Sequence, residues 1–223
     1  MNNWDYILSI TPYIFSGAAI AVKVYIITIL LSIPLGMLCA VGKLSKFSIL
    51  GFRPLAAVLE VYTWIFRGTP LLLQLFFAYF GLQALGIELQ REVAAYVTFV
   101  INYAAYFTEI FRGGIQSIDR GQYEAAKALG MTSGQTMKKI IIPQGLKVVL
   151  PPTGNEAINL IKDTALCSVL GIAEITRNAK AVSARDFSIE GYFVAAAIYL
   201  IFTFVIIQVF RYLEKRFSYY NPS

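Results

Sequence analysis

The stretch GYFVAAAIYLIFTFVIIQVF, residues 191–210, contains no charged side chain and is long enough to cross a membrane as one helix. A transmembrane α-helix needs about 20 mostly apolar residues, because lipid leaves every backbone polar group to be satisfied within the helix. The whole chain has the same character, since 57% of its 223 residues are hydrophobic and its mean hydropathy is +0.63. The sequence therefore predicts an all-α integral membrane protein.

Four further segments are apolar enough to be spans once a few embedded polar residues are allowed. The five predicted spans form a single transmembrane domain over residues 1–223: 13–42, 55–85, 93–111, 148–173 and 191–210. An odd number of spans places the termini on opposite sides. One set of connections carries twelve Lys and Arg residues and the other carries four, so the richer side is expected to be cytoplasmic. We expect the N-terminus outside, and the C-terminus and the loop 112–147 in the cytoplasm.

The composition excludes several classes of site. The chain has no histidine, which removes Ser-His-Asp and Cys-His catalysis and His-ligated zinc or haem. Its two cysteines, Cys39 and Cys167, lie in apolar stretches and are interpreted as packing residues. It also lacks the G-x-x-x-x-G-K-[ST] phosphate-binding loop and the G-x-S-x-G and H-E-x-x-H motifs. We therefore expect no enzyme activity, no metal and no cofactor on this chain.

Polar side chains form stripes along three predicted spans. They recur at helical spacing on one face of each span: Pro152, Asn155, Glu156, Asn159, Lys162 and Asp163; Glu60, Thr63, Arg67, Pro70 and Gln74; Asn102, Tyr106 and Glu109. An ionisable side chain facing lipid at mid-membrane costs about 2.5–3.5 kcal/mol. The stripes thus indicate either a water-accessible pathway or interhelical hydrogen bonds that hold the bundle together. Glu109 beside Arg112 is also consistent with an ion pair at the membrane boundary.

The second predicted span is too long for one straight helix. Residues 55–85 would extend about 46 Å, against a hydrocarbon core of about 30 Å. The segment Arg67-Gly68-Thr69-Pro70 is the expected break, because proline removes a backbone donor and disfavours helix at the preceding residue. Transporters bind substrates at such interruptions, although a plain proline kink is the alternative.

The loop 112–147 is predicted to hold two short helices. Residues 119–130 have an acid at the start, an alanine-rich middle and Gly130 as a stop. Thr132 and Gln135 have the spacing of a capping box that opens a second helix, which is predicted to run to Pro143. A helix–stop–helix of small residues on the cytoplasmic surface is typical of a docking element.

The loop also carries a spaced pattern: Glu124-Ala125-Ala126, then Gly130, then Ile140-Ile141-Ile142-Pro143. It resembles the EAA signature of ATP-binding-cassette (ABC) importer permeases, with isoleucine where leucine usually precedes the proline. The stretches 66–74, 154–156 and 162–166 are similar to those of polar amino-acid uptake permeases, the inner-membrane components of binding-protein-dependent importers, although Ala165 stands where serine is more common.

This resemblance, which covers nearly the whole chain, implies a type I ABC importer permease in the bacterial plasma (inner) membrane. It implies two paired permease subunits, an extracytoplasmic solute-binding protein, and a separate ATPase subunit that binds ATP and Mg. The helix with Glu124, Ala125, Ala126 and Gly130 would seat in a cleft of that ATPase. Glu124 would pair there with a basic residue or simply cap the loop.

A polar amino acid would meet the polar stripes on the second and fourth spans. The candidate substrate-binding residues are Arg67, Thr69, Gln74, Asn155, Glu156, Asn159 and Asp163. Arginine suits the ligand carboxylate and a carboxylate suits its ammonium group. The alternatives are that Arg67 caps the broken helix and that Lys162 neutralises Asp163 or Glu156.

The polar stripes alone would serve an ion-coupled carrier or a channel equally well, and such a protein would need no ATPase. The spaced loop pattern favours the importer. Which amino acid is carried, and whether the two permease subunits are identical, are not readable from the sequence.

Overall fold

The computed structural model describes residues 3–45, 48 and 51–217, and these residues form helices and no strands. The ends of the predicted domain, residues 1–2 and 218–223, lie outside the described residues. The α-helices are α1 (Asn3–Ser16), α2 (Ala18–Leu44), α3 (Pro54–Gly68), α4 (Leu71–Phe76), α5 (Leu82–Ala84), α6 (Arg91–Gln116), α7 (Arg120–Ala128), α8 (Ser133–Thr136), α9 (Ile142–Asp163), α10 (Ile175–Asp186) and α11 (Glu190–Phe217). Two π-helical turns, Phe77–Gly81 and Met137–Ile141, and a 3-10 helix, Thr164–Leu170, join some of them.

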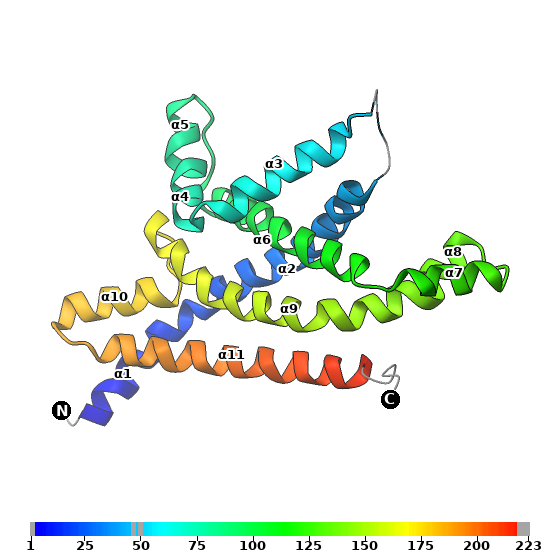
Figure 1. Ribbon diagram of the computed structural model, residues 1–223. Coiled ribbons are helices and arrows are strands. Elements are labelled where there is room, and N and C mark those ends of the chain that lie inside the picture. The colour runs from blue at the N-terminus through cyan, green and yellow to red at the C-terminus, as the bar shows by residue number, and fades with distance from the viewer. Residues whose placement is uncertain (1–2, 46–47, 49–50, 218–223) are drawn as a thin grey trace.

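Helix α6 is the centre of the fold, with α2, α3, α4 and α9 packed against it (Figure 1). Twelve of its 26 residues are buried, including Phe99, Tyr103 and Phe107. Gly36 of α2 permits close packing on α6, because a Cβ there would lie 2.6 Å from the Cβ of Phe107. A second core joins α1, the start of α2, α10 and α11. The described residues thus pack around two hydrophobic cores, one on α6 and one that joins α1, α10 and α11.

Three helical segments in the described residues are long and apolar enough to cross a membrane: Asn3–Leu44, Arg91–Gln116 and Glu190–Phe217. The pair α3 and α4–α5 qualifies as a fourth, bent by 105°. The predicted break is therefore confirmed, with α3 ending at Gly68 and α4 beginning at Leu71. The fourth predicted span, 148–173, corresponds to most of α9 and the following 3-10 helix, which do not meet the same criterion. The count of five spans stays a prediction.

The loop prediction is correct at its start and wrong at its end. Helix α7 is present, and the Thr132–Gln135 capping box opens α8. The second helix does not end at Pro143, however, because a π-helical turn carries it directly into α9. Pro143 stands in the first turn of α9, directly after the π-helical turn, and the helix continues through it.

Candidate functional site

The break between α3 and α4 leaves backbone carbonyls without helical partners, and two amide side chains bind them. The Gln74 Nε2 atom donates to the carbonyl oxygens of Phe66 and Thr69 at 3.0 and 3.2 Å, and to the Thr69 hydroxyl at 2.7 Å. Asn102 of α6 donates to the Phe66 carbonyl at 2.9 Å and to the Gln74 Oε1 atom at 3.0 Å. Because Asn102 is only 3% exposed, this network fixes the bend inside the protein.

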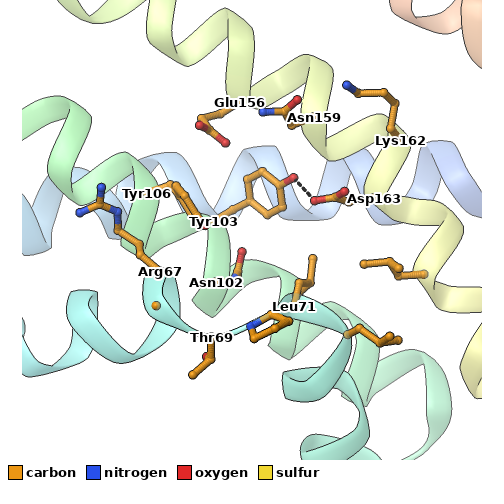
Figure 2. A pocket seen from close by; sticks show the side chains of 14 residues that line it. Arg67, Thr69, Leu71, Asn102, Tyr103, Tyr106, Glu156, Asn159, Lys162 and Asp163 are labelled. Carbon is orange, nitrogen blue, oxygen red and sulfur yellow. Dashed lines mark hydrogen bonds between the residues drawn. The ribbon is translucent and has the colours of Figure 1, made fainter.

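A cavity of about 730 Å³ opens beside the break, between α3–α4, α6 and α9 (Figure 2). Its lining mixes both charges, amides and aromatic rings: Arg67, Gly68, Thr69, Pro70, Leu71, Leu72, Asn102, Tyr103, Tyr106, Glu156, Asn159, Lys162, Asp163 and Leu166. Figure 2 shows the α9 side chains on one side of the cavity, Tyr103 between them and the break, and Arg67 at the end of α3.

Helix α9 brings its polar side chains to the cavity by helical spacing. Glu156, Asn159 and Asp163 follow at i, i+3 and i+7, so they lie on one face. The Tyr103 hydroxyl donates a 2.7 Å hydrogen bond to the Asp163 Oδ2 atom, which ties α6 to α9. Helix α9 therefore brings two carboxylates and the Lys162 ammonium group to the cavity, whereas Arg67 brings a positive charge from α3.

The structure separates the seven candidate ligand residues into two groups. Those that line the cavity are Arg67, Thr69, Glu156, Asn159 and Asp163. Gln74 instead binds the carbonyl groups of the break, and it lines a second, almost wholly apolar pocket on the other side of α4. Asn155 is exposed on α9 and does not line the polar cavity. Lys162 lines the cavity and makes no ion pair within the described residues.

Sequence reasoning missed two features of the site. Tyr103 directly follows Asn102, which belongs to the polar stripe of α6. An aromatic residue in an apolar span does not by itself indicate that its hydroxyl binds a carboxylate. Lys43 falls just after the predicted span 13–42, yet it belongs to α2 and its side chain is only 4% exposed. Its Nζ atom lies 2.6 Å from both the Glu60 and the Glu109 carboxylates, so Glu109 pairs with more than its neighbour Arg112.

The predicted coupling residues lie on a well-terminated surface helix. Asp119 caps the start of α7 by accepting from the Gly121 N–H at 2.6 Å. At the other end Gly130 has φ +72°, and backbone hydrogen bonds from Gly130 to Lys127 and from Met131 to Ala126 close a Schellman motif. Glu124 and Ala125 are exposed and Ala126 is buried. Leu129, the residue that directly follows α7, is 78% exposed.

Comparison with known proteins identifies the class. Residues 32–219 match the family described as binding-protein-dependent transport system inner membrane component. The arginine transport system permease protein ArtQ of Bacillus subtilis (strain 168) is 37% identical over 207 residues, which cover 92% of each chain. The putative glutamine transport system permease protein GlnP of Rickettsia bellii (strain RML369-C) is 36% identical over 221 residues, covering 96% of this chain and 98% of that relative.

A solved structure extends the similarity to three dimensions. The crystal structure of an amino acid ABC transporter with histidines aligns with a TM-score of 0.85 and 35% identity, covering 95% of this chain and 97% of the other. The chain belongs to the family of binding-protein-dependent transport system inner membrane components. It is thus the permease subunit of an ABC importer in the bacterial inner membrane, and permease subunits are not themselves catalytic. Membership favours this function over a carrier that works without an ATPase.

Proposed function

We propose that the cavity at the helix break is the place where a polar L-amino acid passes through this permease. The observation that carries the proposal is that the Arg67 guanidinium and the carboxylates of Glu156 and Asp163 line one cavity. A zwitterionic amino acid has one carboxylate and one ammonium group, and each finds an opposite charge there. Relatives named for arginine and glutamine, and a solved transporter with histidines, support the substrate class without choosing one member.

The proposed topology has five spans in a single domain, with the N-terminus outside and the C-terminus in the cytoplasm. Figure 1 supports opposite positions for the two ends of the chain: α1 and α10 lie at one end of the molecule, and α7, α8 and the end of α11 at the other. A solute-binding protein would deliver the amino acid at the first end, near residues 81–92 and 174–190. A second permease subunit, identical or homologous, would complete the pathway.

A separate ATPase, which binds the ATP and Mg, is proposed to dock on α7. The exposed Glu124 and Ala125 and the turn at Gly130 offer it a short rigid helix. Closure of two nucleotide-binding subunits would push on this helix in each permease subunit. The spans would then rock between outward-open and inward-open states.

Docking is tested by purifying the tagged chain from its host in mild detergent and identifying the proteins that accompany it. Wild type is expected to bring an ATPase subunit, and Gly130→Val to lose it, because a β-branched residue rarely adopts positive φ. Gly134→Val is the matched control, since a Cβ at Gly134 meets no atom within 4 Å and the residue lies in α8. Absence of an ATPase from the wild-type preparation contradicts the importer and directs attention to ion-gradient-driven uptake.

The cavity is tested by one substitution at two positions of α9. Asn159→Ala removes a cavity residue, whereas Asn155→Ala removes an exposed amide one turn earlier. Uptake of radiolabelled L-arginine, L-glutamine and L-histidine by cells that carry each variant is expected to fall with Asn159→Ala and to stay near wild type with Asn155→Ala. Equal losses in both variants would argue against the cavity as the pathway.

A further inference from the structure

Beside the cavity, five charged side chains from α2, α3 and α6 form one ion-pair cluster: Lys43, Glu60, Arg67, Glu109 and Arg112. Within this cluster three positive charges share two carboxylates. Glu109 is its centre, because three cations lie within 4.0 Å of its carboxylate. The cluster therefore carries one surplus positive charge.

The geometry assigns that surplus to Arg67. Lys43 lies 2.6 Å from the Glu109 Oε1 atom, and Arg112 lies 2.7 Å from the Oε2 atom. The Arg67 Nη1 atom approaches the same Oε2 atom only to 3.8 Å. Two guanidinium groups thus share one oxygen, and Arg67 has the weaker share because the Coulomb attraction falls with distance.

Arg67 is also the member of the cluster that lines the cavity. Its side chain is 43% exposed, compared with 15% for Glu109. Its guanidinium lies 5.6 Å from the centre of the Tyr106 ring, another residue of the cavity wall. Arg67 can therefore contact a ligand, whereas Glu109 contacts Arg67 without lining the cavity.

We propose that Glu109 is a specificity-determining residue that competes with the ligand carboxylate for Arg67. In the empty cavity the Oε2 atom of Glu109 attracts Arg67, and a bound carboxylate takes Arg67 from it. Glu109 keeps Lys43 and Arg112 afterwards, so the exchange leaves no carboxylate unpaired. The inference rests on the proposed function, which places an amino acid in this cavity.

Two substitutions are expected to change carboxylate recognition in opposite directions. Glu109→Gln removes the competing charge, so a ligand carboxylate should bind about two- to five-fold more tightly, the scale of a partly exposed ion pair. Arg112→Gln removes the rival for the Oε2 atom, which then attracts Arg67 alone. Carboxylate binding should weaken by a similar factor. A purely structural role for the cluster would weaken binding in both variants.

The experiment is calorimetric titration of the purified permease–ATPase complex with L-arginine and with agmatine, which lacks the carboxylate. L-histidine and histamine form a second pair, and L-glutamine and 4-aminobutanamide form a third. For each pair whose amino acid binds the wild-type complex, the measured quantity is a ratio: the dissociation constant of the amine that lacks the carboxylate, divided by that of the amino acid. Glu60→Gln is the matched control, because Glu60 contacts Lys43 and makes no ion pair with Arg67. Its ratio should equal that of wild type.

The outcomes separate the two proposals. If none of L-arginine, L-histidine and L-glutamine binds the wild-type complex, the proposed site in the cavity is wrong and so is the proposed competition. If an amino acid binds but the ratio is the same in wild type, Glu109→Gln and Arg112→Gln, the competition alone is wrong. Should Glu109→Gln fail to fold, Arg112→Gln still decides: a ratio that does not fall overturns the proposal.

Discussion

Two of the interruptions between helices look alike in sequence, because each has a glycine close to a helix-breaking or capping residue. Their backbone groups are nevertheless satisfied in different ways. Between α3 and α4 the freed carbonyls are bound by Gln74 and by Asn102, which comes from another helix. Between α7 and α8 the chain turns at Gly130, and Thr132 and Gln135 cap the next helix. All partners of the second turn are within a few residues of it.

The difference follows from the surroundings of the two interruptions. The first lies within a bent helix pair that is apolar enough to span a membrane, and one of the side chains that bind its carbonyl groups, Asn102 of α6, is only 3% exposed. The second lies on exposed residues of a surface loop, where water and a local cap suffice. A break inside the bundle therefore depends on distant residues, and a surface break does not. The same dependence positions the wall of the polar cavity.

The largest effect is expected from Asn102→Leu. This change removes the 2.9 Å hydrogen bond to the Phe66 carbonyl and the donor to the part-buried Gln74 Oε1 atom. An unsatisfied buried polar group costs about 1–3 kcal/mol, so the thermal unfolding midpoint in detergent should fall clearly. Asn155→Leu, the same change at an exposed position of α9, is the control and should have little effect. Equal shifts in the two variants would contradict the role of Asn102 at the break.

Gln74→Leu is expected to have a somewhat smaller effect, of about 1–2 kcal/mol. Thr69 loses its donors, but Asn102 still binds the Phe66 carbonyl. Because the two amides share that carbonyl and bind each other, the double variant should cost less than the two single changes added together. A double-mutant cycle of unfolding free energies measures this coupling. Strict additivity would show that the two side chains act independently.

How much the sequence could predict follows the same division between local and distant contacts. The cap at Asp119, the turn at Gly130 and the capping box depend on neighbouring residues, so their spacing sufficed. The break itself was predictable from Gly68 and Pro70. Its closure was not, because Asn102 lies 36 residues from Phe66 and only the packing of α6 brings them together.

The two wrong or incomplete assignments have physical reasons too. Proline usually ends a helix, but at Pro143 a π-helical turn leads directly into α9 and the helix continues through the proline. A polar stripe on a helix is about 100° wide, so periodicity alone does not show which edge faces a cavity. Asn155 and Asn159 are on the same stripe, and only Asn159 lines the polar cavity.

The smallest effect is expected at the surface interruption. Thr132→Ala removes the oxygen that accepts from the Gln135 N–H at 3.3 Å, and loss of an N-cap costs about 0.5–2 kcal/mol. Because the partners are local and exposed, the loss should appear as faster amide hydrogen exchange in residues 132–136, with little change in the unfolding midpoint. Thr132→Ser, which keeps the hydroxyl, should exchange like wild type. If Thr132→Ala instead lowers the midpoint as much as Asn102→Leu does, the surface turn is tied to the bundle as firmly as the break between α3 and α4, and the distinction between the two interruptions is wrong.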